Sequence, residues 1–137
     1  MIRTVRLLRC ARGASTIEFA LLAPVFLVFL FGLIEAGRLM WVTQSINEVA
    51  YSSARCMSTS SSCATTTAIQ SYAVSRAATY QLTITAANVV TASNITCDGN
   101  AGSNKVTVTY AVRSAVRTML PFIPASIVGY ACFPKLS

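Results

Sequence analysis

The sequence predicts an α+β protein in which a long N-terminal transmembrane and stalk helix precedes a short helix and a small antiparallel β-sheet. Three observations predict this class. An apolar run near the N-terminus is long enough to span a membrane, helical periodicity continues beyond it, and strand-forming residues fill the last third of the chain. The 137 residues leave room for one small domain besides the apolar segment.

The N-terminal region combines a basic segment with an uncharged one. Arginines at positions 3, 6, 9 and 12 precede residues 19–34, which contain no charge. Residues 17–37 as a helix would be roughly 31 Å long, close to the hydrocarbon core of about 30 Å. Because basic residues stay on the cytoplasmic side, the C-terminal part is expected to face away from the cytoplasm. Residues 1–13 are therefore predicted to be a basic leader and residues 14–37 a transmembrane helix.

Two charged residues mark the outer end of the span. Glu35 and Arg38 are three positions apart, a spacing that places their side chains side by side on a helix. We expect them to form an interfacial pair, with Arg38 reaching outward from the membrane.

Helical periodicity continues through residues 38–57, which are predicted to be an amphipathic extension of the same helix. Its apolar stripe has two interpretations: it packs on the chain's own domain, which is favoured, or on neighbouring copies. The stripe consists of Leu39, Val42, Ile46, Val49 and Ser53. The Ser/Thr-rich residues 58–67 then predict a loop.

Residues 68–137 are predicted to be an extracytoplasmic α+β domain. A short amphipathic helix is expected over residues 66–80. Residues 88–92 and 95–97 are β-prone pieces, and residues 98–104 predict a turn-rich connector. The alternating residues 105–112 predict a strand, residues 120–125 an irregular segment between prolines, and residues 127–133 a last strand.

Five cysteines fit this topology. Cys10 lies on the cytoplasmic side of the span, which leaves Cys56, Cys63, Cys97 and Cys132 on the oxidising side. Four cysteines allow three pairings. We favour Cys56 with Cys63, closing the Ser-rich loop, and Cys97 with Cys132, joining two strands. The alternative is that some of them are free buried thiols.

Charge and composition argue against other function classes. Beyond the leader, seven basic residues are scattered singly against four acidic ones, whereas nucleic-acid binding needs a basic stripe or patch. The chain contains no histidine, and no nucleophile–base set or zinc spacing is evident. We therefore expect no enzyme activity, no metal or cofactor, no nucleic acid and no small-molecule substrate.

The N-terminal residues resemble a known family. The arginine-rich leader, Gly13, the Glu18-Phe19 pair and the runs at residues 20–26 and 31–38 look like those of TadE-like pseudopilins, minor components of the bacterial tight-adherence type IV pilus system. A further likeness extends over residues 105–133. Because a major pilin of that system is little more than the N-terminal helix, the outer domain favours a minor pilin or pseudopilin with a pilin-like fold.

The resemblance implies processing and assembly at the start of the helix. A prepilin peptidase would cut between Gly13 and Ala14, and the new Ala14 amine would be mostly protonated at neutral pH. Glu18 would pair with such an amine on a neighbouring pilin, and Phe19 would be the adjacent recognition aromatic. The implied partners are the inner membrane, the peptidase, other pilins or pseudopilins and the assembly platform. The protein would span the inner membrane once, with its domain in the periplasm or in a surface pilus used for adhesion.

Two alternatives stay open. The chain is an uncleaved single-pass membrane protein whose outer domain binds partners, or it is a secreted protein whose first 37 or so residues form a signal peptide. The second alternative is disfavoured because the apolar run is long and ends without a clear small-x-small cleavage site.

Overall fold

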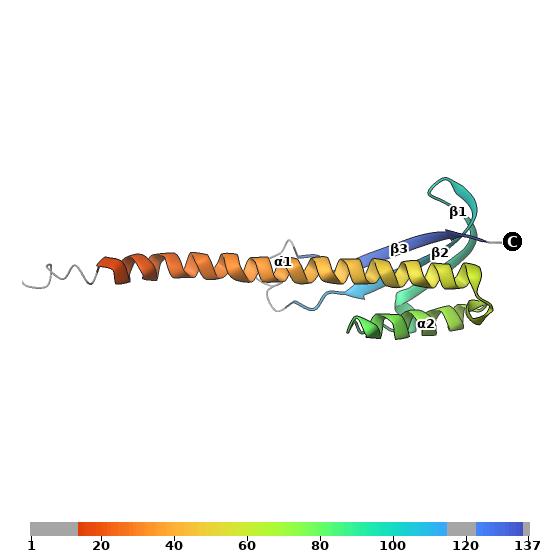
Figure 1. Cartoon of the computed structure of the whole chain (residues 1–137), viewed down its shortest axis with the longest axis horizontal. Coiled ribbons are helices and arrows are strands. Elements are labelled where there is room, and N and C mark those ends of the chain that lie inside the picture. Colours follow the sequence, from red (N-terminus) through yellow and green to blue (C-terminus); the bar gives the residue numbers. More distant parts are fainter. Residues whose placement is uncertain (1–13, 115–122, 136–137) are drawn as a thin grey trace, which may run out of the picture. The chain divides into compact units, whose positions relative to one another are not determined.

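The computed structural model describes residues 14–114 and 123–135 of the chain. The element order is a long helix, a short helix and a three-stranded antiparallel sheet, which is the α+β, pilin-like layout that the sequence predicts (Figure 1). The chain divides into two compact units, residues 1–39 and residues 40–137. The first unit contains the apolar part of the long helix, and the second contains the rest of that helix with the other elements.

Helix α1 runs from Ala14 to Thr59, so the apolar and amphipathic stretches belong to one element, as predicted. No glycine or proline occurs from residue 38 to residue 57, and the helix therefore continues without an intrinsic breaker. Pro24 lies inside α1 in the first unit. Its ring removes one backbone donor, a loss that membrane-spanning helices tolerate better than soluble ones.

The second unit buries one face of α1 in its own core. Ile46, Val49, Ala50 and Ala54 are completely buried, and Val42 is 5% exposed. These positions recur every three to four residues, the period of a helix face. Of the two interpretations of this stripe, packing on the chain's own domain is the one that the structure shows.

Helix α2 spans Thr66–Thr79 and follows a short 3₁₀ turn at Ser61–Cys63 within the predicted loop. The Thr65 side chain accepts a hydrogen bond from the Ala68 amide at 3.2 Å and so caps the helix start. Ile69, Ala73 and Ala77 form its buried face. The prediction of a short amphipathic helix is confirmed, with its end one residue earlier than expected.

The sheet contains β1 (Val89–Cys97), β2 (Asn100–Ala111) and β3 (Ser126–Pro134) in the order β1-β2-β3. The 3₁₀ turn Ala86–Asn88 precedes β1. The buried apolar side chains of the sheet include those of Val89, Val106, Val108 and Ile127, and Ser103 and Asn104 of β2 are buried as well. Such alternation between a buried and a more exposed face is typical of an antiparallel sheet covered on one side.

Two sequence predictions about the sheet need correction. The two β-prone pieces at 88–92 and 95–97 form the single strand β1, with register shifts between Ala92 and Ile95 and between Ile95 and Cys97. The turn-rich connector predicted at 98–104 is only the turn Asp98–Gly99, because β2 already begins at Asn100. Both turn residues have positive φ, 49° and 83°, as the tight Asp-Gly hairpin turn requires. Of the predicted irregular segment 120–125, residues 120–122 lie outside the described residues.

Strand β3 approaches α1 very closely at one position. A Cβ atom added to Gly129 would lie 2.8 Å from the Ile46 Cγ2 atom and 3.1 Å from the Asn47 backbone nitrogen. Only a residue without a side chain fits this crossing. Toward the C-terminal end of α1, Asn104 on β2 donates a hydrogen bond of 3.0 Å to the Ser58 hydroxyl, which donates in turn to the Phe133 carbonyl on β3 at 3.3 Å. These contacts hold the end of α1 on the sheet.

Candidate functional site

The expected processing and assembly residues lie at the start of α1. Gly13 lies outside the described residues, and Ala14 is the first residue of α1. Glu18 follows one helical turn later and Phe19 next to it, and both side chains are exposed. Glu18 has no ion pair within residues 14–114 and 123–135. The structure thus places the Glu18 carboxylate one turn from Ala14, directly before the uncharged residues 19–34.

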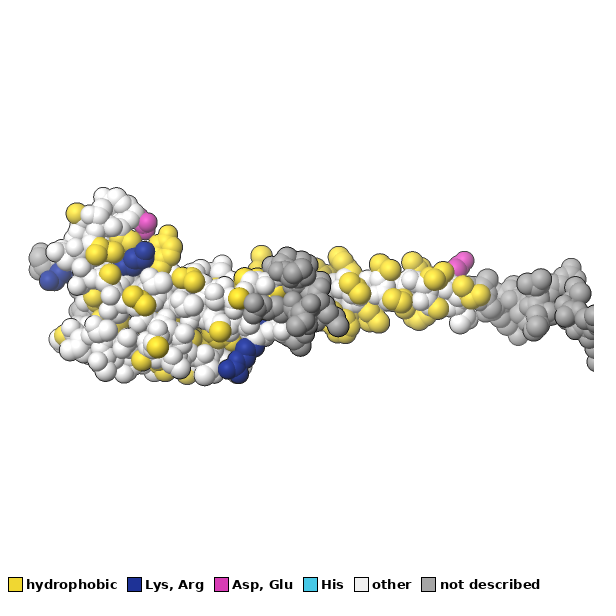
Figure 2. Space-filling model, turned by 180° about the vertical axis from the view of Figure 1, so that it is seen from behind, with side chains coloured by type: hydrophobic (Ala, Val, Ile, Leu, Met, Phe, Trp, Pro, Cys, Tyr) yellow, Lys and Arg dark blue, Asp and Glu magenta, His cyan; other side chains and the backbone are white. Residues whose placement is uncertain are grey.

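The part of α1 around these residues has an apolar surface that no described residue of its unit covers. Phe19 is 73% exposed, and Figure 2 shows hydrophobic side chains along this part of the helix. α1 has the length and composition needed to cross a membrane, with a mean hydropathy of 2.5 in its most apolar window. A surface of this kind marks contact with lipid or with a partner protein. The exposed large apolar residues between 17 and 34 are Ile17, Phe19, Leu21, Leu22, Val25, Phe26, Leu27, Val28, Phe29, Leu30, Phe31, Leu33 and Ile34.

Glu35 and Arg38 form the ion pair that their spacing predicts. The Arg38 Nε and Nη2 atoms donate to the two Glu35 carboxylate oxygens at 3.2 and 3.1 Å. The Glu35 side chain is 19% exposed and that of Arg38 is 41% exposed. The two-point geometry neutralises both charges at the end of the apolar stretch.

Both favoured cysteine pairings are present as disulfides. Cys56 near the end of α1 is bonded to Cys63 in the following 3₁₀ turn, with a Cα–Cα distance of 5.7 Å. Cys97 at the end of β1 is bonded to Cys132 on β3, with a Cα–Cα distance of 6.2 Å. Asp98 is close to the second disulfide, but both sulfur atoms there are engaged with each other, so this cluster offers a metal no thiolate pair.

The Cys97–Cys132 disulfide crosses the middle strand. Strands on either side of a third strand lie about 9.6 Å apart, twice the usual spacing, which is farther than a disulfide reaches. The register shifts after Ala92 and Ile95, with Asn94 at a φ of 54°, let the end of β1 bend toward β3. Figure 1 shows the β1–β2 hairpin curving at this end. The disulfide therefore fixes the Asp98–Gly99 turn on the sheet.

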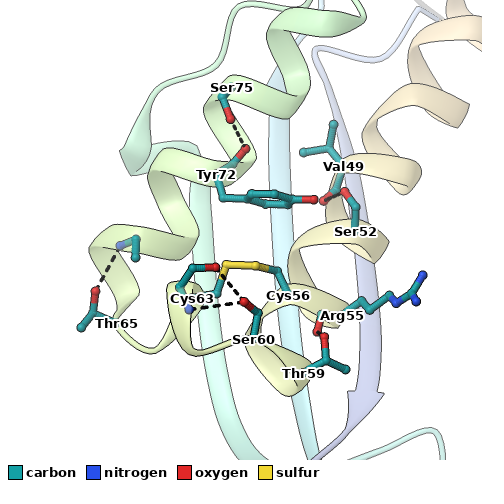
Figure 3. Close-up of a disulfide and its surroundings, with 12 residues drawn as sticks. Val49, Ser52, Arg55, Cys56, Thr59, Ser60, Cys63, Thr65, Tyr72 and Ser75 are labelled. Carbon is teal, nitrogen blue, oxygen red and sulfur yellow. Dashed lines mark hydrogen bonds between the residues drawn. A yellow bond between two sulfur atoms is a disulfide. The ribbon is translucent and has the colours of Figure 1, made fainter.

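A polar groove between α1 and α2 was not predicted from the sequence. Its volume is about 320 Å³, and Figure 3 shows its walls, with the Cys56–Cys63 disulfide between the two helices. Tyr72 points from α2 toward α1, whereas Arg55 reaches outward from α1 at the rim. The lining residues are Glu48, Tyr51, Ser52, Arg55, Cys56, Thr59, Ser60, Tyr72 and Arg76.

The groove has an excess of positive charge. Arg76 lies 3.7 Å from Glu48, a loose ion pair, and its Nε atom is buried without a hydrogen-bond partner among the described residues. The Arg55 guanidinium has no acidic partner in the same residues. The residues that line the groove thus include two guanidinium groups and one carboxylate, that of Glu48.

A signal for this groove exists in the sequence. Tyr51 and Arg55 on α1 are four residues apart, as are Tyr72 and Arg76 on α2. Four-residue spacing puts each pair on one helix face. Nothing in the sequence shows that the two faces meet, because that follows from the packing of α2 against α1 and the sheet.

Comparison with known proteins gives one family match. Residues 13–55 match the family model described as TadE-like protein. The match confirms the resemblance over the start of α1, including Glu18, Phe19 and the Glu35–Arg38 pair, and it does not reach the further likeness at 105–133. No curated protein and no solved structure matches the chain.

Proposed function

We propose that this chain, whose residues 13–55 match the family model of TadE-like proteins, is a minor pilin or pseudopilin of a tight-adherence pilus system, processed by a prepilin peptidase and active in pilus assembly and adhesion. The family match carries the proposal. The uncovered apolar surface of α1 supports it, because a pilin-type helix needs such a surface both in the membrane before assembly and among neighbouring helices afterwards.

The proposed topology places the N-terminus in the cytoplasm and residues 40–137 in the periplasm. The arginine cluster supports this orientation through the positive-inside rule. The two disulfides support it independently, since such bonds persist in oxidising compartments and are rare in the cytosol. The proposed partners are the inner membrane, the peptidase, other pilins and the assembly platform.

In the proposed assembly, Glu18 of one subunit pairs with the Ala14 amine of a neighbour. The exposed Glu18 side chain and the lack of a cation beside it in the described residues support this role, because a charge in an apolar bundle is stable only when it is paired. Phe19 would contribute an aromatic contact next to the pair.

Intact-mass analysis with N-terminal sequencing tests the processing step. The protein is produced with and without a prepilin peptidase, and a mature chain starting at Ala14 is expected only with the active enzyme. Gly13→Leu serves as a matched variant that should remain uncut. A chain starting at Met1 under both conditions would favour an uncleaved membrane protein, and a start near residue 38 would favour a secreted one.

A further inference from the structure

We propose that copies of this protein associate head to tail, with Asp98 on the β1–β2 turn of one copy bound at the Arg55 rim of the α1–α2 groove of the next. The proposal goes beyond pilus membership, and it holds for any assembly in which full-length copies meet. It rests on two features of the second unit. The Asp98 carboxylate has no basic partner among the described residues, and the groove is lined by two arginines but one acidic residue.

Asp98 differs from the other acidic residues of the chain in its surroundings. Glu35 pairs with Arg38 and Glu48 pairs with Arg76, whereas Glu18 belongs to the apolar part of α1. Asp98 is exposed and has no ion pair or hydrogen bond within the described part of the chain. It is therefore the carboxylate of the second unit that is available to a partner.

The turn that carries Asp98 is suited to docking. It consists of two residues, Asp98 and Gly99, so it is narrow, and Gly99 adds no side chain beside the carboxylate. The Cys97–Cys132 disulfide ties the turn to β3. A tied turn loses little conformational entropy on binding, which favours association.

The groove offers the complementary chemistry. Arg55 supplies a guanidinium without an acidic partner among the described residues, and Tyr51 and Tyr72 supply aromatic walls for a short backbone segment. Tyrosine and arginine are the side chains most enriched at the energetic centres of protein interfaces. Tyr51 also packs edge to face against Phe133, with ring centroids 6.1 Å apart, which holds its ring in place.

The turn and the groove are different surfaces of the same unit, so a contact between them is heterologous. It leaves a free turn on one copy and a free groove on the other, and such contacts extend into open assemblies when the rotation does not close. One exposed ion pair contributes little by itself. Copies held together in a membrane or fibre make many such contacts at high effective concentration, which raises the overall affinity.

Site-specific photo-crosslinking of the full-length chain in its membrane tests the proposal. A photo-reactive phenylalanine analogue replaces Thr59, an exposed residue of the groove, and mass spectrometry identifies the linked peptide. The expected product is a dimer whose linked peptide contains Asp98. The same analogue at Thr83, an exposed residue outside the groove, should give no such product.

Charge-reversal variants make the test specific. Asp98→Arg and Arg55→Asp, each alone, should lower the yield of crosslinked dimer about tenfold, because like charges then face each other. The double variant should restore most of the yield. Arg113→Asp makes the same change of charge outside both surfaces and should leave the yield unchanged. Both disulfides must persist in every variant, as shown by thiol alkylation and mass, so that a lost crosslink reports a lost contact and not a lost fold.

Other outcomes overturn the proposal. These are a crosslink from position 59 to another protein, a link to a different segment of this chain, or equal yields in the single and double variants. None of them bears on cleavage after Gly13, so this contact and the proposed function are tested separately.

Discussion

Gly129 on β3 lies so close to Ile46 on α1 that an added Cβ atom would be 2.8 Å from the Ile46 Cγ2 atom. Ile46 is completely buried, so its side chain cannot turn outward into solvent to make room. The closest backbone atom, the nitrogen of Asn47, would be at 3.1 Å. The packing of the sheet on α1 therefore depends on the absence of a side chain at position 129.

Gly129→Ala is expected to destabilise the second unit by about 1–3 kcal/mol through overpacking, and Gly129→Val by more. Chemical unfolding of the full chain in detergent, followed by near-ultraviolet circular dichroism, measures the loss. Gly99→Ala is a useful comparison because nothing lies within 4 Å of its Cβ position and the cost there comes from its positive φ alone. Unchanged stability of Gly129→Ala would show that β3 can move away from α1 without penalty.

The polar link between α1 and the sheet gives a second prediction. Asn104 is 4% exposed and donates its side-chain hydrogen bond to Ser58. Ser58→Ala leaves this buried amide without its partner, and the free energy of unfolding is expected to fall by about 1–3 kcal/mol. Ser75→Ala is the control, since the Ser75 hydroxyl is exposed and, among the described residues, donates to the Tyr72 carbonyl on its own helix. An equal change in the free energy of unfolding for both substitutions would contradict a stabilising role of the Asn104–Ser58 hydrogen bond.

The two disulfides are expected to differ in their contribution to stability. They close loops with sequence separations of 7 and 35 residues. In the chain-entropy description the shorter loop is worth about 2.5 kcal/mol and the longer about 4 kcal/mol. Replacing Cys97 and Cys132 together by alanine should therefore destabilise the protein more than replacing Cys56 and Cys63. The unfolding midpoints of the two double variants, measured under the same conditions, show which disulfide contributes more to stability.

Glu18→Ala is expected to leave cleavage after Gly13 largely intact and to impair assembly. Loss of one partner of a charge pair in an apolar bundle leaves the other charge unpaired, at a cost of about 3 kcal/mol, which corresponds to roughly a hundredfold in the assembly equilibrium. Processing is followed by immunoblot and piliation by electron microscopy of sheared fractions. Glu18→Gln, which keeps the shape without the charge, should behave like Glu18→Ala. Normal piliation in both variants would rule out the proposed pairing with the Ala14 amine.

Much of the fold could be predicted from local sequence signals. The apolar run and the periodicity up to Ser53 predict α1, and Thr65 before an amphipathic stretch marks the start of α2. The favoured cysteine pairings are those that the structure contains. Between Asp98 and Asn104 the prediction was wrong, because glycines and asparagines that usually signal loops are here part of β2, paired with β1 in an irregular register.

The candidate site could be predicted only in part. Glu18, Phe19 and the Glu35–Arg38 pair belong to one helix, so their spacing alone indicates how they lie. The groove needs two helices in contact, and the placement of Arg55 and Tyr72 on its two walls depends on long-range packing that no local pattern encodes. The Cys97–Cys132 disulfide, which holds Asp98 near β3, likewise depends on a bend in β1. That bend follows from the register shifts in the β1–β2 pairing, which the sequence does not show.

The disulfide that crosses the middle strand also has a mechanical consequence. Because Cys97 and Cys132 join the two outer strands, β2 is enclosed between strands that cannot separate at that end. A load that pulls on β3 is passed to β1 through a covalent bond and does not peel the hydrogen bonds of the sheet one by one. The sheet should therefore resist tension as a single element, and the three strands should separate only after the disulfide is broken.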